Sequence, residues 1–182
     1  MLYPDEMILL CDFETTGLAQ EEGSKAIQFA GLFLRPDMTI ESDFNYHIDY
    51  RDLQDPIPLN HIHGIDKKTL SEKGMSKKQV VEAIQKKLIG LHRDGVRRIY
   101  LSSDNSFFDQ TFAYKLGLIG KHLLHYNPLD FKCLCRMAGV KRPERFNKKH
   151  CAMNDTLNWY RSVLISYDRL KMAVEKRRFE AS

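Results

Sequence analysis

The sequence of 182 residues lacks any long hydrophobic run. A membrane-spanning helix needs about 20 consecutive apolar residues, and no segment comes near that length. The first ten residues, MLYPDEMILL, also lack the basic region and the small-residue cleavage site of a signal peptide. These absences argue against an integral membrane protein, and we expect a soluble, intracellular protein of the cytoplasm.

Cysteine is scarce, with four residues spaced unevenly along the chain. A chain of this length can bury a core without disulfides, since 43% of its residues are hydrophobic. Cys133 and Cys135 are closer together than the gap of about two to four residues in most zinc sites, and no second pair follows. We therefore expect no structural zinc site, and we expect Cys11 and Cys133 to be small core residues.

Internal repeats, low-complexity segments and long linkers are also missing, so we expect one domain spanning residues 1–182. The charge is nearly balanced, with 28 basic and 24 acidic residues and a net charge of +4. The segment KRPERFNKK, residues 141–149, is an exception because five of its nine residues are Lys or Arg. It ends directly before His150, which makes Lys148 and Lys149 candidates for contact with a phosphate backbone.

The order of the expected elements indicates an α/β fold. Apolar runs with alternation predict three strands joined as an antiparallel meander, at residues 7–14, 25–34 and 39–48. A fourth strand, RRIYLSS, is expected at residues 97–103. Helical spacing and end signals predict helices at residues 76–92, 106–118, 131–139 and from about 150 to 178, with a short helix after NHIHGI. This order favours a central mixed β-sheet flanked by α-helices.

Three polar residues are expected to cap these helices. Ser76 directly precedes the apolar periodicity of residues 76–92, and Asp130 directly precedes the helix 131–139. Ser106 lies three residues before Asp109, which is the spacing of a capping box. The single tryptophan, Trp159, lies on the apolar face of the last helix, where we expect it in the core.

Two acidic residues stand at the end of the first expected strand, in the segment LLCDFETTGL. Residues two apart on a strand share a face, so Asp12 and Glu14 point the same way. Neighbouring carboxylates repel, and burying them unpaired is expensive. Either the strand end is solvated or paired with Lys or Arg, or a divalent cation lies between the two groups.

The residues after this pair favour a ligand. Thr15, Thr16 and Gly17 predict a tight turn whose backbone N–H groups are candidates for holding a phosphate or a terminal sugar. The glycine would also let a ligand approach the backbone closely. A ligand at the end of this strand is therefore our preferred explanation for the two carboxylates.

A metal site requires further oxygen ligands, which Mg²⁺ prefers in octahedral geometry. Two such ions about 3.5–4 Å apart form the usual clamp for phosphoryl displacement. Asp109 lies among three phenylalanines and Asp155 lies near the start of the last helix, and both are candidates. Either one is also explained as an acidic residue favouring a helix N-terminus.

His150 precedes Asp155 by five residues. On a continuous helix this spacing separates the two side chains by about 140°. If both serve one site, His150 must therefore lie at the helix entrance, outside regular helical geometry. The small Ala152 would let this helix pack closely against the site.

Together these segments resemble the three motifs of the DEDDh 3′–5′ exonucleases, the family of polymerase proofreading subunits (DnaQ-like) and RNase T. The first motif is DFETTGL at residues 12–18, the second is DNSFFDQTF at 104–112, and the third is HCAMND at 150–155. The similarity extends from about residue 7 to residue 165. The second motif departs from the family, because Ser103 and Asp104 stand where Gly-His is frequent.

The resemblance implies an RNase H-like fold and a two-metal mechanism. Asp12, Glu14, Asp109 and Asp155 would hold two Mg²⁺ or Mn²⁺ ions, and His150 would be the general base. The reaction would remove nucleotides from 3′ ends of single-stranded DNA or RNA as nucleoside 5′-monophosphates. The expected substrate contacts are Thr15, Thr16, Gly17, Leu18 as a wedge against the base, His63, Asn105, Lys148 and Lys149.

Two alternatives stay open at this point. The first is a catalytically inactive exonuclease-like module that binds nucleic acid or protein. The second is a proofreading or trimming subunit of a larger complex, since a chain of this size holds no polymerase domain. The choice between DNA and RNA, and the presence of a protein partner or a homodimer, are also open.

Overall fold

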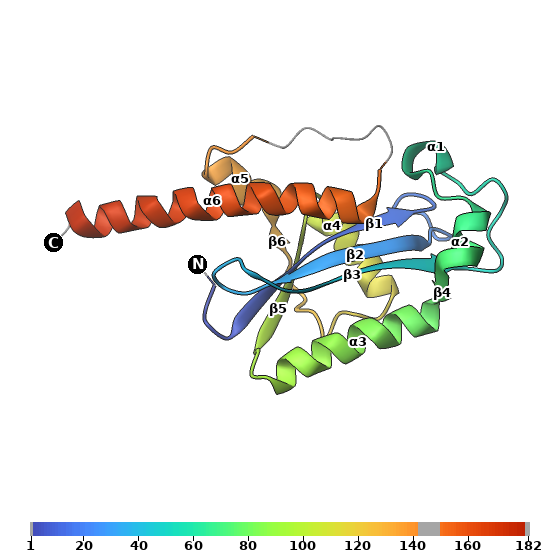
Figure 1. Ribbon diagram of the computed structural model, residues 1–182, viewed down its shortest axis with the longest axis horizontal. Helices are drawn as coiled ribbons and strands as arrows, with labels where there is room; N and C mark the ends of the chain where they lie inside the picture. The colour runs from blue at the N-terminus through green and yellow to red at the C-terminus, as the bar shows by residue number, and fades with distance from the viewer. Residues whose placement is uncertain (1, 142–149, 181–182) are drawn as a thin grey trace.

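A mixed sheet of six strands forms the centre of the computed structural model, which describes residues 2–141 and 150–180, apart from the side chains of 178–180 (Figure 1). The strand order is β4-β3-β2-β1-β5-β6. The strands are β1 Glu6–Thr15, β2 Ala26–Leu34, β3 Ile40–Asp49, β4 Gly74–Ser76, β5 Arg98–Ser103 and β6 Leu129–Asp130.

Helices cover both faces of this sheet. They are α1 Asn60–His63, α2 Lys67–Lys73, α3 Lys77–Arg93, α4 Ser106–Lys115, α5 Phe131–Met137 and α6 Ala152–Glu180. Helices α5 and α6 pack on one face, and α3 and α4 pack on the other (Figure 1). Within the described ranges, no helix is long and apolar enough to cross a membrane.

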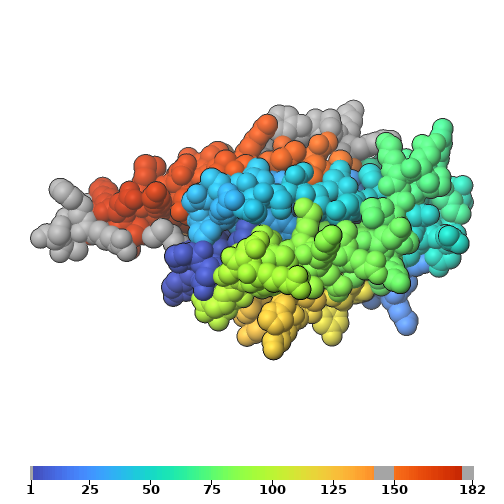
Figure 2. All heavy atoms as spheres, turned by 60° about the horizontal axis from the view of Figure 1, so that its bottom comes forward, coloured from blue at the N-terminus to red at the C-terminus, as the bar shows by residue number. Residues whose placement is uncertain are grey.

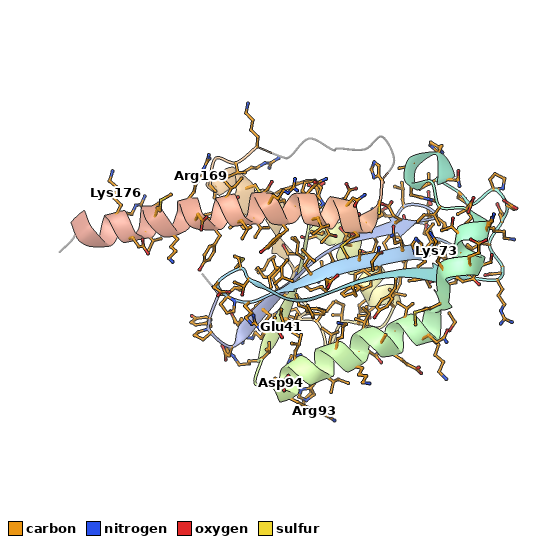
Figure 3. The ribbon with its side chains drawn as sticks, in the orientation of Figure 1. Glu41, Lys73, Arg93, Asp94, Arg169 and Lys176 are labelled. Carbon is orange, nitrogen blue, oxygen red and sulfur yellow. The ribbon has the colours of Figure 1, made fainter. Side chains whose placement is uncertain are left out.

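The C-terminal part of α6 projects beyond the sheet (Figure 2). Lys176 lies on this projecting part (Figure 3). Arg169, about two turns earlier, still contacts the body of the protein, because its Nη1 donates to the carbonyl of Gly139 at 2.9 Å. The helix is therefore anchored over the sheet by its N-terminal part.

The predicted meander and the predicted fold class are both confirmed. Strand β1 pairs antiparallel with β2, and β2 pairs antiparallel with β3. Strand β5 adds to the other edge of β1 in parallel, with Leu10 opposite Ser102. All nine residues of β2 are buried, because the strand lies inside the sheet with helices over both faces.

Alternate residues of β1 enter two different cores. Leu9, Cys11 and Phe13 pack on the side of α3 and α4. Ile8 and Leu10 pack on the side of α5 and α6, in a cluster that includes Trp159 at 2% exposure, as predicted. Because side chains alternate along a strand, the even-numbered carboxylates at the end of β1 face α6.

Two of the three predicted helix caps are confirmed. The Ser76 hydroxyl accepts a hydrogen bond from the Gln79 N–H at 3.3 Å, within a full capping box at the start of α3. The Asp130 carboxylate accepts from the Cys133 N–H at 2.9 Å at the start of α5. These contacts satisfy N–H groups that have no partner within the helix.

The predicted cap at Ser106 is wrong, and so is the core position of Cys133. Ser106 is the first residue of α4, and its hydroxyl donates to the Leu129 carbonyl at 3.0 Å, because β6 passes beside it. Cys133 is exposed, whereas Cys135 is buried. The two positions that α5 turns inward are Phe131 and Cys135, four residues apart on one helix face.

Candidate active site

Three side chains from two distant parts of the chain converge at the C-terminal end of β1. Glu14, His150 and Asp155 each offer one ligand atom, and these atoms lie within 4.8 Å of one another. Nδ1 of His150 is 3.9 Å from Oδ2 of Asp155. Glu14 and Asp155 are buried, whereas the His150 side chain is 29% exposed and reaches solvent.

The start of α6 explains how His150 and Asp155 can share a site. The helix begins at Ala152, so His150 lies at its entrance, as predicted. Ala152 is fully buried, which allows the helix end to approach the sheet closely. Asp155 lies in the first turn, and its N–H donates to the Cys151 carbonyl at 2.9 Å.

Asp12 and Asp109 lie beside this group without belonging to it. Asp12 is half-buried on the same strand face as Glu14. Burial raises the pKa of the Cys11 thiol well above its ordinary value, and the charges of Asp109 and Asp12 raise it further, so both carboxyl groups lie near Cys11. The structure thus brings three of the five predicted residues, Glu14, His150 and Asp155, into one group, while Asp12 and Asp109 lie near Cys11 of β1.

Asp109 is the most strongly perturbed of these carboxyl groups. Its side chain is buried, and burial raises its pKa to about 7 although the Ser103 hydroxyl, 2.6 Å from Oδ2, acts in the opposite direction. The neighbouring Asp104 raises that pKa further. Ser103 is one of the two positions that depart from the family motif, and the structure shows that it holds the carboxyl group of Asp109.

The donor set at this end of β1 fits a hard divalent cation. Among the described residues, Oδ1 of Asp109 has no hydrogen-bond partner. Burying such an oxygen is expensive unless a cation or a proton compensates it. Carboxylate oxygens are the preferred ligands of Mg²⁺ and Mn²⁺, and His150 adds an imidazole next to them.

The turn after β1 differs from the expectation of free backbone donors. The Thr16 N–H donates to the Lys25 carbonyl at 2.9 Å, and the Leu18 N–H donates to Oε2 of Glu21 at 2.9 Å. A Cβ atom at Gly17 would overlap the Glu21 carboxylate, so any larger residue there would displace that side chain. One of the three expected backbone donors, that of Thr16, is therefore engaged within the protein, and the N–H of the next residue after the turn is held by an acidic side chain.

Two other residues of this turn have different environments. Thr15 is buried, and its hydroxyl donates to the Gly17 carbonyl at 2.8 Å, so it stabilises the turn. Leu18 is 59% exposed, which leaves its side chain accessible to a nucleotide base. Of the four residues predicted to grip the substrate here, Leu18 presents the most surface to solvent.

His63 has a structural position. It is buried, its Nε2 lies 3.1 Å from the Pro58 carbonyl, and its Nδ1 accepts from the Ile65 N–H at 3.0 Å. Burial lowers the pKa of this imidazole, which suits a neutral ring with one donor and one acceptor. The carbonyl of the preceding residue, Ile62, accepts a hydrogen bond from the His150 N–H at 3.0 Å. The short helix α1 therefore helps to position His150.

Three predicted substrate contacts remain, and the structure describes one of them. Asn105 is exposed at the start of α4, and its side chain makes no capping hydrogen bond. Lys148 and Lys149 lie outside the described residues.

Gln28 is a site residue that the sequence reasoning missed. It is buried on β2 directly opposite Glu14. Its Oε1 accepts the Ala152 N–H at 3.2 Å, and its Nε2 donates to Oδ1 of Asn45 at 2.9 Å. A single amide in the otherwise apolar strand AIQFAGLFL was the available signal, because a buried amide needs partners.

Comparison with known proteins identifies a matching family model and similar folds. Residues 9–162 match a family model described as exonuclease. No curated protein sequence matches the chain. Among solved structures, the fold is similar to that of E. coli Exonuclease I in complex with a dT13 oligonucleotide, at 15% identity and a TM-score of 0.64, covering 97% of this chain and 43% of that chain.

Two further solved structures show the same likeness. Exonuclease I from Methylocaldum szegediense gives 15% identity and a TM-score of 0.69, covering 90% of this chain and 40% of that one. The zinc-ion-bound form of the E. coli ExoI–ssDNA complex gives 16% identity and a TM-score of 0.63, with 90% and 41% covered. The chain thus spans less than half the length of these Exonuclease I chains, and at this identity the likeness concerns the fold.

Proposed function

The chain belongs to the exonuclease family, and we propose that it hydrolyses nucleotides from the 3′ ends of single-stranded nucleic acid, releasing nucleoside 5′-monophosphates. The observation that carries this proposal is the convergence of Glu14, His150 and Asp155 within 4.8 Å. A solvated strand end would not bring a carboxylate from β1 together with an imidazole and a second carboxylate from the start of α6.

Four carboxylates would hold the metal ions in this proposal, those of Asp12, Glu14, Asp109 and Asp155. When bound, two Mg²⁺ or Mn²⁺ ions would activate the attacking water and stabilise the leaving oxygen. His150 would accept the proton of that water, because its side chain is 29% exposed and lies beside the buried acids. Asp155, 3.9 Å from its Nδ1, would orient the imidazole ring.

Single-stranded DNA is the first substrate to test. The solved neighbours include Exonuclease I bound to dT13, to dA16 and to single-stranded DNA. RNA remains an equal candidate for this chain, because discrimination depends on contacts to the 2′-hydroxyl. Leu18 would contact the terminal base and Asn105 the terminal nucleotide, while roles for Lys148 and Lys149 stay predictions.

The domain organisation and cellular setting also stay proposals. We take residues 1–182 as one exonuclease domain, which is supported by both main cores packing against the same sheet. A protein partner, a homodimer and an intracellular location are predictions from the sequence.

The proposed function is tested with oligonucleotides labelled at either end and incubated with Mg²⁺. We expect the 3′ label to appear first as a mononucleotide and the 5′ label to give a ladder of shortening products. Asp12→Ala should lower the rate by about 10²–10³-fold or more, as expected when charge stabilisation is lost. The proposal fails if the wild type leaves both labels intact or if Asp12→Ala keeps full activity.

A further inference from the structure

A cavity of about 220 Å³ lies behind the turn that follows β1, on the side of the sheet covered by α3 and α4. Three lysines from separate segments line it: Lys25 just before β2, Lys77 at the start of α3 and Lys115 at the end of α4. Apolar side chains, including Phe112, form its inner wall. Among the described residues, its lining includes no acidic side chain. We call it the lysine cavity.

The cavity lies at one end of α3. Figure 3 labels Lys73, at the end of α2, and Arg93, at the end of α3, near opposite ends of this helix. Lys77 belongs to the Lys73 end, which is also the end at which β3 meets β4. The cavity therefore lies near the same end of the sheet as the carboxylates of β1, but on the opposite face, which α3 and α4 cover.

Backbone carbonyls, which carry no net charge, hold two of the three ammonium groups. Nζ of Lys115 donates to the carbonyls of Ala19 at 3.1 Å and Glu21 at 3.3 Å. Nζ of Lys77 donates to the Lys115 carbonyl at 3.2 Å. These hydrogen bonds position the two ammonium groups while leaving their positive charges uncancelled, and an ammonium has three donors in total.

One carboxylate pairs with the third lysine. Nζ of Lys25 lies 2.6 Å from Oδ2 of Asp52, whose side chain is 76% exposed. An ion pair this exposed to solvent is weak. The three ammonium groups therefore keep an excess of positive charge around a small cavity with an apolar wall.

A phenol adds a neutral donor to the same cavity. Nζ of Lys25 lies 5.1 Å from the centre of the Tyr50 ring, which lines the cavity. Burial, together with the charge of Asp52, raises the pKa of Tyr50 to about 12. The phenol thus stays protonated, and a pocket of ammonium groups and a hydroxyl donor suits a phosphate.

The lysine cavity adjoins the candidate active site through the turn after β1. The Lys25 N–H donates to the Thr16 hydroxyl at 2.9 Å, and the Thr16 N–H donates to the Lys25 carbonyl at 2.9 Å. Thr16 is only two residues after Glu14. A strand of nucleic acid whose end reaches Glu14 would have to cross this turn, at the end of the sheet, to reach the cavity on the other face.

We propose that the lysine cavity binds a backbone phosphate of the nucleic-acid strand whose 3′ end enters the candidate active site. This inference rests on the proposed function. A free nucleoside 5′-monophosphate offers the same phosphate chemistry, so the experiment includes it as a separate probe.

The test measures binding of a fluorescent single-stranded dT oligonucleotide by anisotropy over a range of NaCl concentrations, in an Asp12→Ala background that prevents degradation. The double variant Lys77→Gln/Lys115→Gln should lower the affinity about threefold to tenfold, because neither amide can form an ion pair with a phosphate. The slope of log K against log salt should become shallower by about 0.7 for each phosphate that the variant no longer neutralises.

Lys78→Gln is the matched control. Lys78 follows Lys77 on α3, its side chain is 85% exposed, and it pairs with Glu82 at 3.9 Å outside the cavity. The Lys78→Gln variant removes one positive charge from the same helix. It should change the affinity for the oligonucleotide, and the slope of log K against log salt, less than Lys77→Gln alone. Lys77→Arg keeps the charge and should restore binding, which separates a phosphate contact from a loss of folding.

Activity with the Asp12 side chain restored gives an independent readout. The double variant should raise KM for a long oligonucleotide while leaving kcat, and the cleavage of a dinucleotide too short to reach the cavity, unchanged. Equal affinity and slope in the Lys77→Gln and Lys78→Gln variants would overturn the proposal. If the double variant lost binding of the nucleoside 5′-monophosphate but kept oligonucleotide binding, the cavity would not bind a backbone phosphate of the nucleic-acid strand.

The outcome is distinguishable from failure of the proposed function. If the wild type shows no exonuclease activity but the lysine variants still lose oligonucleotide affinity, the cavity binds nucleic acid and the catalytic proposal alone is wrong. If activity is present and the lysine variants match the control, the catalytic proposal stands and the inference on the cavity is wrong.

Discussion

Buried carboxyl groups lie at both ends of β1, and their pKa values are shifted in opposite directions. Glu6, the first residue of the strand, accepts hydrogen bonds from the Tyr100 hydroxyl at 3.1 Å and from Arg98 at 3.3 Å. Burial raises its pKa, but the Tyr3 N–H, Tyr100 and Arg98 outweigh burial, so the pKa lies below its ordinary value. At the other end, burial dominates and the pKa of Asp109 rises to about 7.

The comparison shows that burial alone does not decide the state of these groups. Glu6 is 4% exposed and Asp109 is 2% exposed, so their solvent exposure is similar. They differ in their partners, because Glu6 has Arg97 and Arg98 within 4.0 Å, whereas the hydrogen bond to Asp109 comes from the neutral Ser103. The Glu6 end is neutralised within the protein, and the Asp109 end is suited to an external cation.

The largest expected effect is on kcat, which should depend on the carboxylates at one end of β1 and not on the carboxylate at the other. Glu14→Gln should lower kcat about 10²–10³-fold, because it removes a charge from the candidate metal site. Glu6→Gln removes an equal charge from the same strand and should leave kcat within about twofold, since it lies at the opposite end. Steady-state kinetics on a single-stranded oligonucleotide with Mg²⁺ gives both values, and similar losses in the two variants would break the comparison.

Stability should respond in the reverse order. Glu6→Gln should lower the free energy of unfolding by about 1–3 kcal/mol, the usual value of a hydrogen bond to a charged group. Asp109→Asn should raise it by about 0.5–2 kcal/mol in metal-free protein, as relief of a destabilised functional site often does. Urea unfolding in EDTA measures both free energies. If Asp109→Asn destabilises the protein, the buried carboxyl group of Asp109 does not destabilise the metal-free fold.

The pH dependence sharpens the same contrast. Since Asp109 has a pKa of about 7 when folded and near 3.8 when unfolded, the folded state binds more protons between these values. Its stabilising contribution is therefore fully present below about pH 4 and is lost as the pH rises through about 7. Metal-free wild type should lose stability over this window relative to Asp109→Asn.

Thermal unfolding in EDTA at a series of pH values tests this loss of stability with rising pH. Glu6→Gln is the control with the opposite sign, because a lowered folded pKa gives stability that is lost at acid pH. A constant difference in Tm between wild type and Asp109→Asn from pH 4 to pH 7.5 would contradict the expected titration.

The smallest expected effect concerns Gln28, which joins β2 to the start of α6. Gln28→Leu removes the acceptor of the Ala152 N–H and should lower kcat about threefold to tenfold by loosening His150 and Asp155. Gln28→Glu keeps an acceptor and should recover part of that loss. Gln85→Leu on α3 is the control, and equal kcat values for Gln28→Leu and Gln85→Leu would remove Gln28 from the site.

Local patterns predicted the parts of this molecule that depend on neighbouring residues. Alternation gave the three-strand meander, and short-range side-chain bonds gave the caps at Ser76 and Asp130. Helical geometry predicted that His150 lies outside α6 if it shares a site with Asp155, and it does. The motif residues predicted the end of β1 as the place where the acids meet.

Features that depend on distant partners could not be predicted from sequence patterns. Strands β4 and β6 have three and two residues, and they are strands only because β3 and β5 pair with them. Glu21 fills the turn after β1, and Gln28 caps a helix 124 residues later in the chain. The lysine cavity likewise assembles residues 25, 77 and 115.

Calorimetric titration of Mn²⁺ into metal-free protein at pH 8 tests whether the acidic groups at the end of β1 bind divalent cations. The account predicts binding of about two ions per chain, with loss of at least one of them in Asp155→Asn and unchanged binding in Glu6→Gln. Absence of Mn²⁺ binding by folded wild-type protein, or identical binding by wild type and Asp155→Asn, would contradict it and favour an exonuclease-like binding module.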